Sequence, residues 1–206
     1  MPLTVLDHSL AGILLSRLRA ADTPPERFRP LTRALTHILL VEATRALPTE
    51  TVTVETPLEA ASGTVLRHGI VAVPILRAGL GMLDAVLEQL PEATVGYFGL
   101  ERDEVTAVAS SYYAKLPMVD GKTVLLLDPM LATGGSAAWA VEQLTAAGAA
   151  LVVLLCVVAA PEGAGLLQTR FPHLHIVTAA LDRELDARRY IRPGLGDFGD
   201  RLYGTF

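Results

Sequence analysis

The sequence contains a single cysteine, Cys156, so no disulfide can form within the chain and a zinc site built from several cysteines is excluded. It also lacks an apolar run of the roughly 20 residues that span a bilayer. The longest such run, Ala149 to Ala160, ends at Pro161. The N-terminus lacks the basic and apolar segments of a secretory signal. We therefore expect a cytoplasmic protein with no membrane partner.

Basic side chains are in the minority, 17 against 22 acidic ones, for a net charge of -5. This balance argues against non-specific binding to nucleic acid, which depends on phosphate neutralisation. We therefore expect no nucleic-acid partner, although an RNA-binding, nucleotide-sensing regulator is a second hypothesis. An anionic small substrate remains compatible, because a few arginines, backbone amides and a cation can make one pocket positive.

Apolar periodicity divides the 206 residues into a helical start and an alternating remainder. Residues 10 to 47 have helical spacing, and Pro24 and Pro25 separate two helices; a strand follows at Val52 to Glu55. Apolar runs then occur at 70–73, 94–98, 124–127, 151–158 and 176–179. Helical stretches lie between most of them, at 80–90, 136–147 and 163–170. The pattern predicts an α/β fold with a mainly parallel central sheet flanked by helices.

Ligands of such sheets bind beyond the carboxyl ends of the strands. One strand ends at Asp128 and is followed by Thr133-Gly134-Gly135-Ser136 at the start of a helix. Successive amides and hydroxyls at a helix start can hold a phosphate. The alternative interpretation is a tight turn with Asp128 as a local cap.

Two other loops place arginines at strand ends. Arg77 stands in Val73 to Gly81, where glycines allow close approach of a ligand, and Arg102 stands in Gly99 to Asp103. Either arginine could instead form a surface ion pair. The alternating stretch from Val105 to Lys115 is an arm over the site or an edge strand.

Two familiar nucleotide motifs fail on context. Gly121-Lys122-Thr123 imitates the end of a Walker loop but precedes its strand. The spacing of Gly194, Gly196 and Gly199 matches the dinucleotide fingerprint, but too few residues follow for a crossover helix and its strand.

The three loops, together with the tail from Tyr190 to Thr205, resemble the uracil phosphoribosyltransferases, a type I phosphoribosyltransferase family. The pairing of DPMLATGGS at 128–136 with PGLGD-x-GDR at 193–201 is highly specific, and the similarity covers nearly the whole chain. The resemblance implies a type I phosphoribosyltransferase fold with N-terminal helices and a small C-terminal base-binding hood. We expect one domain over 1–206, with helices and strand at 1–58, the α/β core at 70–180 and a uracil-binding tail at 181–206.

The resemblance also implies the reaction, which is pyrimidine salvage. The 5-phosphoribosyl group of 5-phospho-α-D-ribose 1-diphosphate (PRPP) is transferred to N1 of uracil, giving UMP and diphosphate. Mg²⁺ carried by the diphosphate would be the cofactor, with no direct protein ligand assigned. A homodimer or larger oligomer is expected, and GTP activates some members. Transfer to a purine base is the rival activity, and the segment 190–198 argues against it. A structural oligomer without catalysis is a further alternative, but it would leave the three loops suited to ligand binding unexplained.

By resemblance, the residues of the site fall into three groups. The catalytic residues are Arg77, Asp128 and Asp197. The PRPP-binding residues are Arg77, Arg102, Asp128, Pro129, Met130, Leu131, Ala132, Thr133, Gly134, Gly135, Ser136 and Asp197. The uracil-binding residues are Ile191, Gly196, Asp197 and Phe198.

Three further expectations concern conformation and packing. Many phosphoribosyltransferases have a cis peptide bond not involving proline in the diphosphate loop, so we expect one within Leu76 to Gly79. Most members have alanine where this chain has Phe198, and we expect its ring to point away from the base, buried near Tyr203 or Phe206. We expect Asp200 to pair with Arg201.

Overall fold

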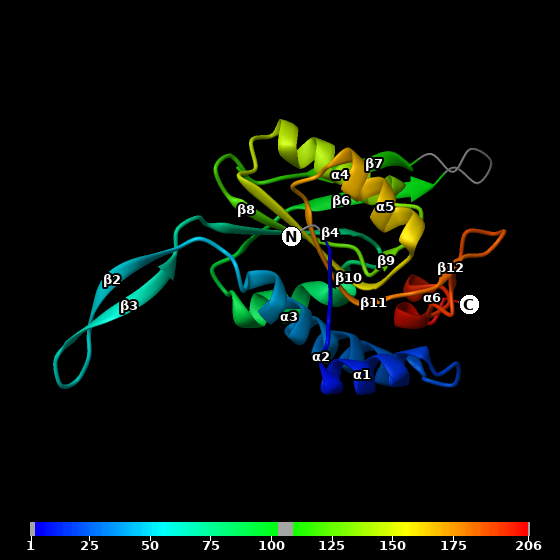
Figure 1. Cartoon of the computed structure of the whole chain (residues 1–206), viewed down its shortest axis with the longest axis horizontal. Helices are drawn as coiled ribbons and strands as arrows, with labels where there is room; N and C mark the ends of the chain where they lie inside the picture. Colours follow the sequence, from blue (N-terminus) through cyan, green and yellow to red (C-terminus); the bar gives the residue numbers. More distant parts are fainter. Residues whose placement is uncertain (1–2, 103–108, 206) are drawn as a thin grey trace.

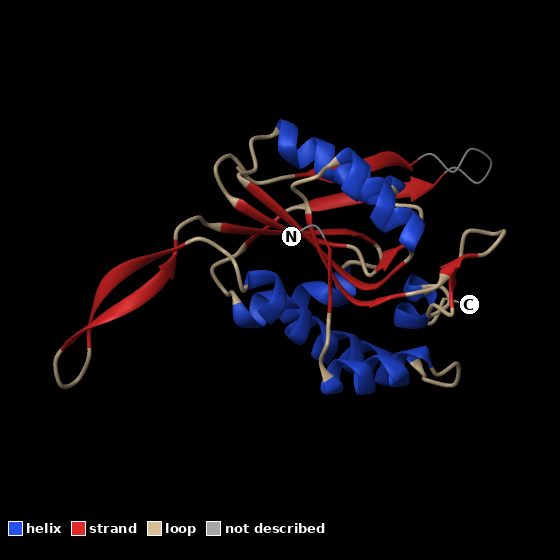
Figure 2. Cartoon of the chain, viewed as in Figure 1, coloured by secondary structure: helices blue, strands red, loops and turns tan. Residues whose placement is uncertain are grey.

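The computed structural model describes residues 3–102 and 109–205, which form a sheet between two layers of helices (Figures 1 and 2). Within the described residues the sheet has nine strands, seven of them in the order β1-β11-β10-β8-β4-β6-β7. Their bounds are β1 Leu3–Val5, β4 Ile70–Leu76, β6 Tyr97–Arg102, β7 Ala109–Lys115, β8 Thr123–Leu127, β10 Leu151–Ala159 and β11 His175–Leu181. Short β5 (Thr94–Val95) and β9 (Met130–Leu131) pair with β4 and β10. All pairs are parallel except β6 with β7, which confirms the expected fold class.

Helices cover both faces of this sheet. On one face lie α1 (Ser9–Arg19), α2 (Pro25–Thr44), α3 (Leu80–Gln89) and α6 (Phe198–Tyr203), and on the other lie α4 (Gly135–Ala146) and α5 (Pro161–Arg170) (Figure 1). Side chains alternate between the two cores: Leu125 and Leu127 of β8 join the first, and Val124 and Leu126 join the second. Burial on both faces explains why these strands are continuous apolar runs. No described helix is long and apolar enough to cross a membrane.

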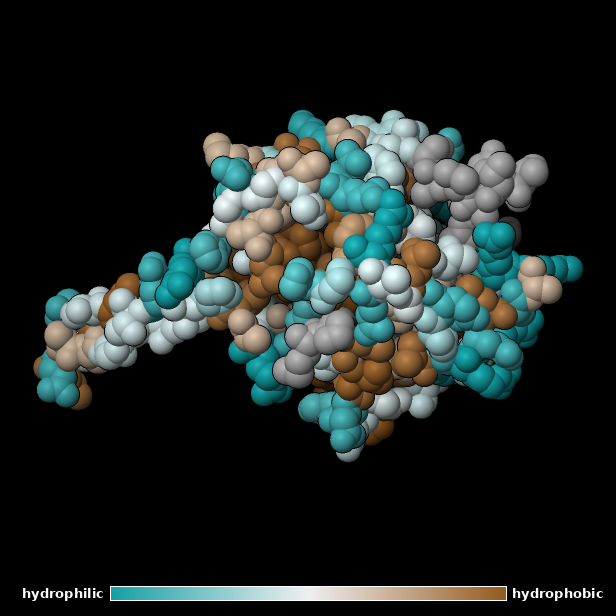
Figure 3. All heavy atoms as spheres, turned by 45° about the horizontal axis from the view of Figure 1, so that its top comes forward, coloured by the Kyte–Doolittle hydropathy of each residue, from teal (hydrophilic) through white to brown (hydrophobic). Residues whose placement is uncertain are grey.

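An antiparallel ribbon stands away from this body. It consists of β2 (Thr49–Glu55) and β3 (Ala60–Leu66), and we call it the arm (Figures 1 and 3). Nearly all its side chains are exposed. The strand expected at Val52 to Glu55 is confirmed, whereas β3 was not predicted. A two-stranded ribbon alone in water is marginally stable, so the arm is suited to contact something beyond this subunit.

The third candidate loop differs from the prediction. The strand expected to end at Phe98 continues as β6 to Arg102, with a register shift between Gly99 and Leu100 where it pairs with β7. β7 lies at the edge of the sheet, as one of the two interpretations proposed. Asp103 and Val105 lie outside the described residues.

The tail begins with a small hairpin, β12 (Glu184–Leu185) with β13 (Ile191–Arg192), and continues through a turn into α6. Figure 1 shows the hairpin and α6 at the end of the sheet where β4, β8 and β9 finish. The tail therefore lies beside the loops that sequence analysis selected.

Candidate active site

The loop after β8 enters α4 through Gly134, the N-cap, which has φ +83°. The amide of Asp128 donates to the carbonyl of Leu155 over 3.1 Å. One carboxylate oxygen of Asp128 accepts from the amide of Met130 at 3.4 Å. Sequence analysis thus placed the strand, the loop and the helix start correctly. The N-terminal end of α4, with its partial positive charge, faces the loop.

The loop between β4 and α3 carries Arg77. The Leu76–Arg77 peptide bond is cis, which confirms the expectation of such a bond in this loop. A Cβ on Gly79 would lie 2.4 Å from the carbonyl oxygen of Leu127, so only glycine lets this loop approach the end of β8. The two loops are thereby packed against each other.

These loops and the tail enclose a cavity of about 300 Å³, which we call the donor cavity. It brings together all three predicted catalytic residues, Arg77, Asp128 and Asp197. Other predicted residues that line it are Met130, Ala132, Gly134, Gly135 and Ser136. Pro129 and Leu131 are buried, and neither they nor Thr133 line the cavity.

Arg77 is well placed for a solvent-borne anion. Its side chain is 61% exposed and its guanidinium lies 3.9 Å from a carboxylate oxygen of Asp200. The hydroxyl of Tyr203 donates to the Arg77 carbonyl at 3.2 Å. Arg102 ends β6, and its side chain lies outside the description, so its contact with the donor stays a prediction.

A second cavity of about 300 Å³, the base cavity, adjoins the first. It gathers all four predicted uracil-binding residues, Ile191, Gly196, Asp197 and Phe198. The two cavities share Met130, Ala132 and Asp197. The base cavity is also lined by Arg188, Arg189 and Tyr190, which lie in the predicted uracil-binding tail but were not among the predicted uracil-binding residues. The signal available there was the pair of arginines just before the tail motif.

Asp197 is both a helix cap and a cavity residue. Its side chain accepts from the amide of Asp200 at 2.9 Å, at the start of α6. Capping of α6 therefore does not remove Asp197 from the two cavities, and its role towards the substrates stays a prediction. The expected Asp200–Arg201 pair is wrong: Asp200 accepts from Thr205 at 2.8 Å, and Arg201 bonds backbone carbonyls instead. Adjacent residues on a helix do not face each other.

Phe198 is 2% exposed, which confirms its expected burial. The partner of the ring that the structure shows was not predicted. The ring packs edge-on against Phe28 of α2 with centroids 5.0 Å apart, whereas Tyr203 is 40% exposed. Phe206 lies outside the described residues. The aromatic ring thus joins the core between the tail and the N-terminal helices.

Cys156 lies near the site but is not a nucleophile. It is fully buried in β10, and burial together with the charge of Asp128 raises the pKa of its thiol well above the usual value. The thiol therefore stays protonated and its role is packing.

The loop over the base cavity, 186–190, is organised by one carboxylate. Asp186 accepts from the amides of Tyr190 and Arg188 and from the guanidinium of Arg192, and these donors hold its pKa below the usual value. In the loop conformation that these hydrogen bonds stabilise, Arg189 has a φ angle of +65°, in the left-handed region that favours glycine.

Replacing Arg189 by glycine should therefore stabilise the protein by about 0.5–1 kcal/mol, because the left-handed cost of a side chain disappears. Thermal or urea unfolding would measure it. Arg188→Gly is the matched control, since Arg188 has no positive φ, and it should give no gain. A loss of stability in Arg189→Gly would contradict the interpretation.

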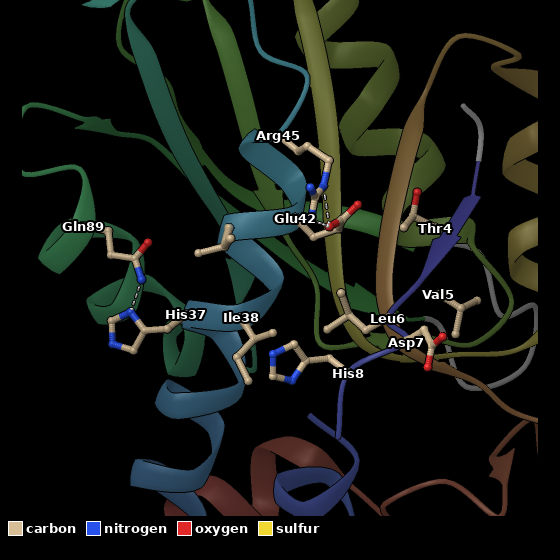
Figure 4. Close-up of a pocket in the computed structure, with 11 residues that line it drawn as sticks. Thr4, Val5, Leu6, Asp7, His8, His37, Ile38, Glu42, Arg45 and Gln89 are labelled. Carbon is tan, nitrogen blue, oxygen red and sulfur yellow. Dashed lines mark hydrogen bonds and ion pairs between the residues drawn. The ribbon is translucent and has the colours of Figure 1, made fainter. Parts of the chain in front are cut away.

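A larger hollow of about 490 Å³ lies elsewhere, between β1, α2 and the end of α3 (Figure 4). Four of its polar side chains are engaged in pairs: Arg45 with Glu42 at 2.7 Å, and His37 with Gln89 at 2.7 Å. No glycine-rich strand end opens into it. We therefore place the chemistry at the paired cavities and not at this hollow.

Comparisons with known proteins agree on one family. A family model described as uracil phosphoribosyltransferase matches residues 5–205. A uracil phosphoribosyltransferase of Dictyoglomus thermophilum is 48% identical over 98% of this chain and 98% of its own. That of Salinibacter ruber is 45% identical over 98% and 97%.

Solved structures show the same architecture. A protein from Aquifex aeolicus matches with TM-score 0.94 and 37% identity, over 98% of both chains. A phosphoribosyltransferase from Corynebacterium diphtheriae, 21% identical, matches over 84% of this chain and 96% of its own with TM-score 0.55. At that identity the likeness shows the fold alone.

Proposed function

Because the chain belongs to the uracil phosphoribosyltransferase family, we propose that the donor and base cavities hold the two substrates of that reaction. The protein is a pentosyltransferase of pyrimidine salvage that transfers the 5-phosphoribosyl group of PRPP to N1 of uracil. UMP and diphosphate are the products. The observation that carries the proposal is the sharing of Met130, Ala132 and Asp197 by the two cavities, since the bond forms between the two substrates.

In this proposal the loop after β8 holds the ribose 5-phosphate. Gly134, Gly135 and Ser136 line the donor cavity at the start of α4, where free amides and the helix dipole favour an anion. Asp128 lies at the opposite end of the loop, at the carboxyl end of β8. Its carboxylate is suited to the ribose hydroxyls, which are hydrogen-bond donors.

Arg77 would bind the diphosphate, with Arg102 as a second cation. When the bond from C1 to the diphosphate oxygen breaks, positive charge develops on the ribose and negative charge on the leaving group. A guanidinium that contacts this leaving group stabilises the transition state more than the ground state, which lowers the barrier. Asp197 lies between the cavities and can stabilise the ribose cation from the base side.

The site also fits a magnesium ion that arrives on the diphosphate. Asp128 and Asp197 are the carboxylates of the donor cavity, and no three potential metal ligands gather anywhere in the described residues. Two carboxylates suit a cation that keeps substrate oxygens and waters as its other ligands. When bound, Mg²⁺ would neutralise charge on the leaving group.

The base cavity would read uracil through the backbone at Gly196 to Phe198, with Ile191 as an apolar wall. Uracil presents two carbonyls and an N3-H between them. A site that hydrogen-bonds this edge penalises bases that leave its groups unpaired. Diphosphate release measured with uracil and with hypoxanthine tests this directly: we expect strong preference for uracil, and equal rates would overturn the assignment.

We further propose that the chain works as a cytoplasmic, single-domain protein that forms a homodimer or larger oligomer and has no nucleic-acid partner. GTP, which activates some members of the family, is a candidate activator. The arm supports the oligomer, because a second copy would cover its exposed apolar side chains. These are Val54, Leu58 and Val65. Added GTP in the uracil assay tests activation.

Removing the arm should dissociate the oligomer. Thr49 and Leu66 are paired at its base, so two glycines can join them in place of residues 50–65. We expect light scattering to give a monomer for this variant and an oligomer for the wild type. A truncated protein that forms an oligomer with the same number of subunits as the wild type would refute the role of the arm.

A further inference from the structure

The base cavity depends on a segment with little secondary structure, the tail turn, Gly194 to Phe198. Gly194 and Gly196 have φ angles of +61° and +76°. A Cβ on Gly194 would lie 2.1 Å from the carbonyl oxygen of Ile191, so this conformation is closed to other residues. A segment outside strands and helices must satisfy its backbone groups through neighbouring side chains.

The start of the tail turn is held by an ion pair. Arg19, the last residue of α1, donates to both carboxylate oxygens of Asp182, at 2.9 and 2.5 Å. The Asp182 carboxylate accepts from the amide of Gly194 at 2.9 Å, and Arg19 donates to the carbonyl of Gly194 at 2.9 Å. The side chain of Asp182 is only 4% exposed. Both backbone polar groups of Gly194 are thus fixed by one pair.

The middle of the tail turn is held by Arg201, which is 8% exposed. One nitrogen, Nη1, donates to the carbonyls of Leu195 at 2.8 Å and Leu18 at 2.6 Å. The other, Nη2, donates to the carbonyl of Ala20 at 2.6 Å. The last two carbonyls belong to the C-terminal end of α1, where helix carbonyls lack partners and carry partial negative charge.

Aromatic rings complete the contact. The guanidinium of Arg201 lies 4.6 Å from the centre of the Phe28 ring, and Phe28 packs against Phe198 at the end of the tail turn. Neither Arg19 nor Arg201 lines the donor or base cavity. Any effect they have on substrate must therefore pass through the backbone that they hold.

We propose that Arg201, together with the Arg19–Asp182 pair, positions the tail turn against the C-terminal end of α1 and thereby sets the affinity for uracil. This inference rests on the proposed assignment of the tail turn to uracil. α1, remote in sequence from the tail, is in this view part of the base-recognition apparatus. If these residues had a purely structural role, replacing them would lower the stability of the protein and change the KM for uracil and the KM for PRPP alike.

The test is R201K in the full-length enzyme. Lysine keeps the charge, but its compact ammonium lacks the planar fork that reaches three carbonyls. We expect the KM for uracil to rise about tenfold, as for the loss of one such hydrogen bond, while the KM for PRPP changes by less than about twofold. R201M removes the guanidinium donor from all three carbonyls and should raise the KM for uracil further.

R19K supplies a second, independent variant at the other end of the tail turn. It keeps the ion pair with Asp182 but weakens the bond to Gly194, so the KM for uracil should again rise selectively. Arg29→Lys is the matched control, because Arg29 donates to the carbonyl of Leu202, beyond the tail turn, at 3.0 Å. It should leave both KM values unchanged.

An R201K and an R19K enzyme with wild-type KM for uracil would overturn the positioning role. So would equal rises in the KM of both substrates, or an Arg29→Lys variant that matches R201K. If only the positioning role is wrong, the wild-type enzyme still releases diphosphate when uracil is added. A wild-type enzyme that released none would overturn the proposed function and, with it, this inference, so the two failures are distinguishable.

Discussion

Replacing Arg77 by alanine, or Asp128 by asparagine, should each reduce kcat/KM for uracil by about 30- to 1000-fold, which corresponds to about 2–4 kcal/mol of lost transition-state stabilisation. Arg77→Ala removes a cation from the donor cavity, where we propose that it binds the diphosphate. Asp128→Asn keeps the size of the side chain but removes the charge that we propose for the ribose. Steady-state kinetics with both substrates varied would measure the effect.

Neither change should unfold the protein, because both side chains lie at strand ends outside the two cores. Arg45→Ala is a matched control for Arg77. Its side chain is 68% exposed and pairs with Glu42, away from both cavities, so its kinetics should equal those of the wild type. Near-normal kcat/KM for Arg77→Ala or Asp128→Asn would mean that the donor cavity is wrongly assigned.

Replacing Phe198 by alanine should cost about 3–4 kcal/mol in the free energy of unfolding, because it deletes a buried ring and its edge-on contact with Phe28. The ratio of kcat/KM for uracil and 5-fluorouracil should stay within about twofold, since base recognition is proposed to use backbone groups. Denaturant unfolding and parallel assays with the two bases would measure both quantities.

Phe171→Ala is the comparison for this change, because Phe171 is half-buried at the end of α5 with Arg170 over its ring. We expect it to lose about 1 kcal/mol, less than Phe198→Ala. A large shift in base preference for Phe198→Ala without loss of stability would show instead that its ring belongs to the base cavity.

Most of the elements that sequence analysis predicted have a buried face; the exception is the exposed arm strand at 49–55, where threonine and valine alternate. The strands at 70–76, 123–127 and 151–159 are buried on both sides and therefore read as continuous apolar runs. The arm strand at 60–66 has almost no buried side chain, so no periodicity marked it. The short strands at 184–185 and 191–192 are too brief to carry a pattern.

The residues that meet at the cavities were predicted through motifs, whereas the contacts behind them were not. Arg201 was expected to pair with its neighbour Asp200, yet its partners at Leu18 and Ala20 are more than 180 positions away in sequence. The same holds for the ring of Phe198, whose partner Phe28 belongs to the N-terminal helices. Local pattern carries no information about such contacts, because they are created by the packing of the chain ends.

That packing has a consequence for synthesis. β1 pairs with β11, and the carbonyl of Leu18 in α1 accepts from Arg201. These N-terminal segments therefore complete their contacts only after β11 and Arg201 have been synthesised. Chains emerge N-terminus first, and α1 and α2 can form while the ribosome is still translating the sheet. The base cavity, however, forms only when the tail turn and Arg201 have left the ribosome. We therefore expect a nascent chain to stay inactive towards uracil until residue 201 has emerged, even though most of the sheet is already complete.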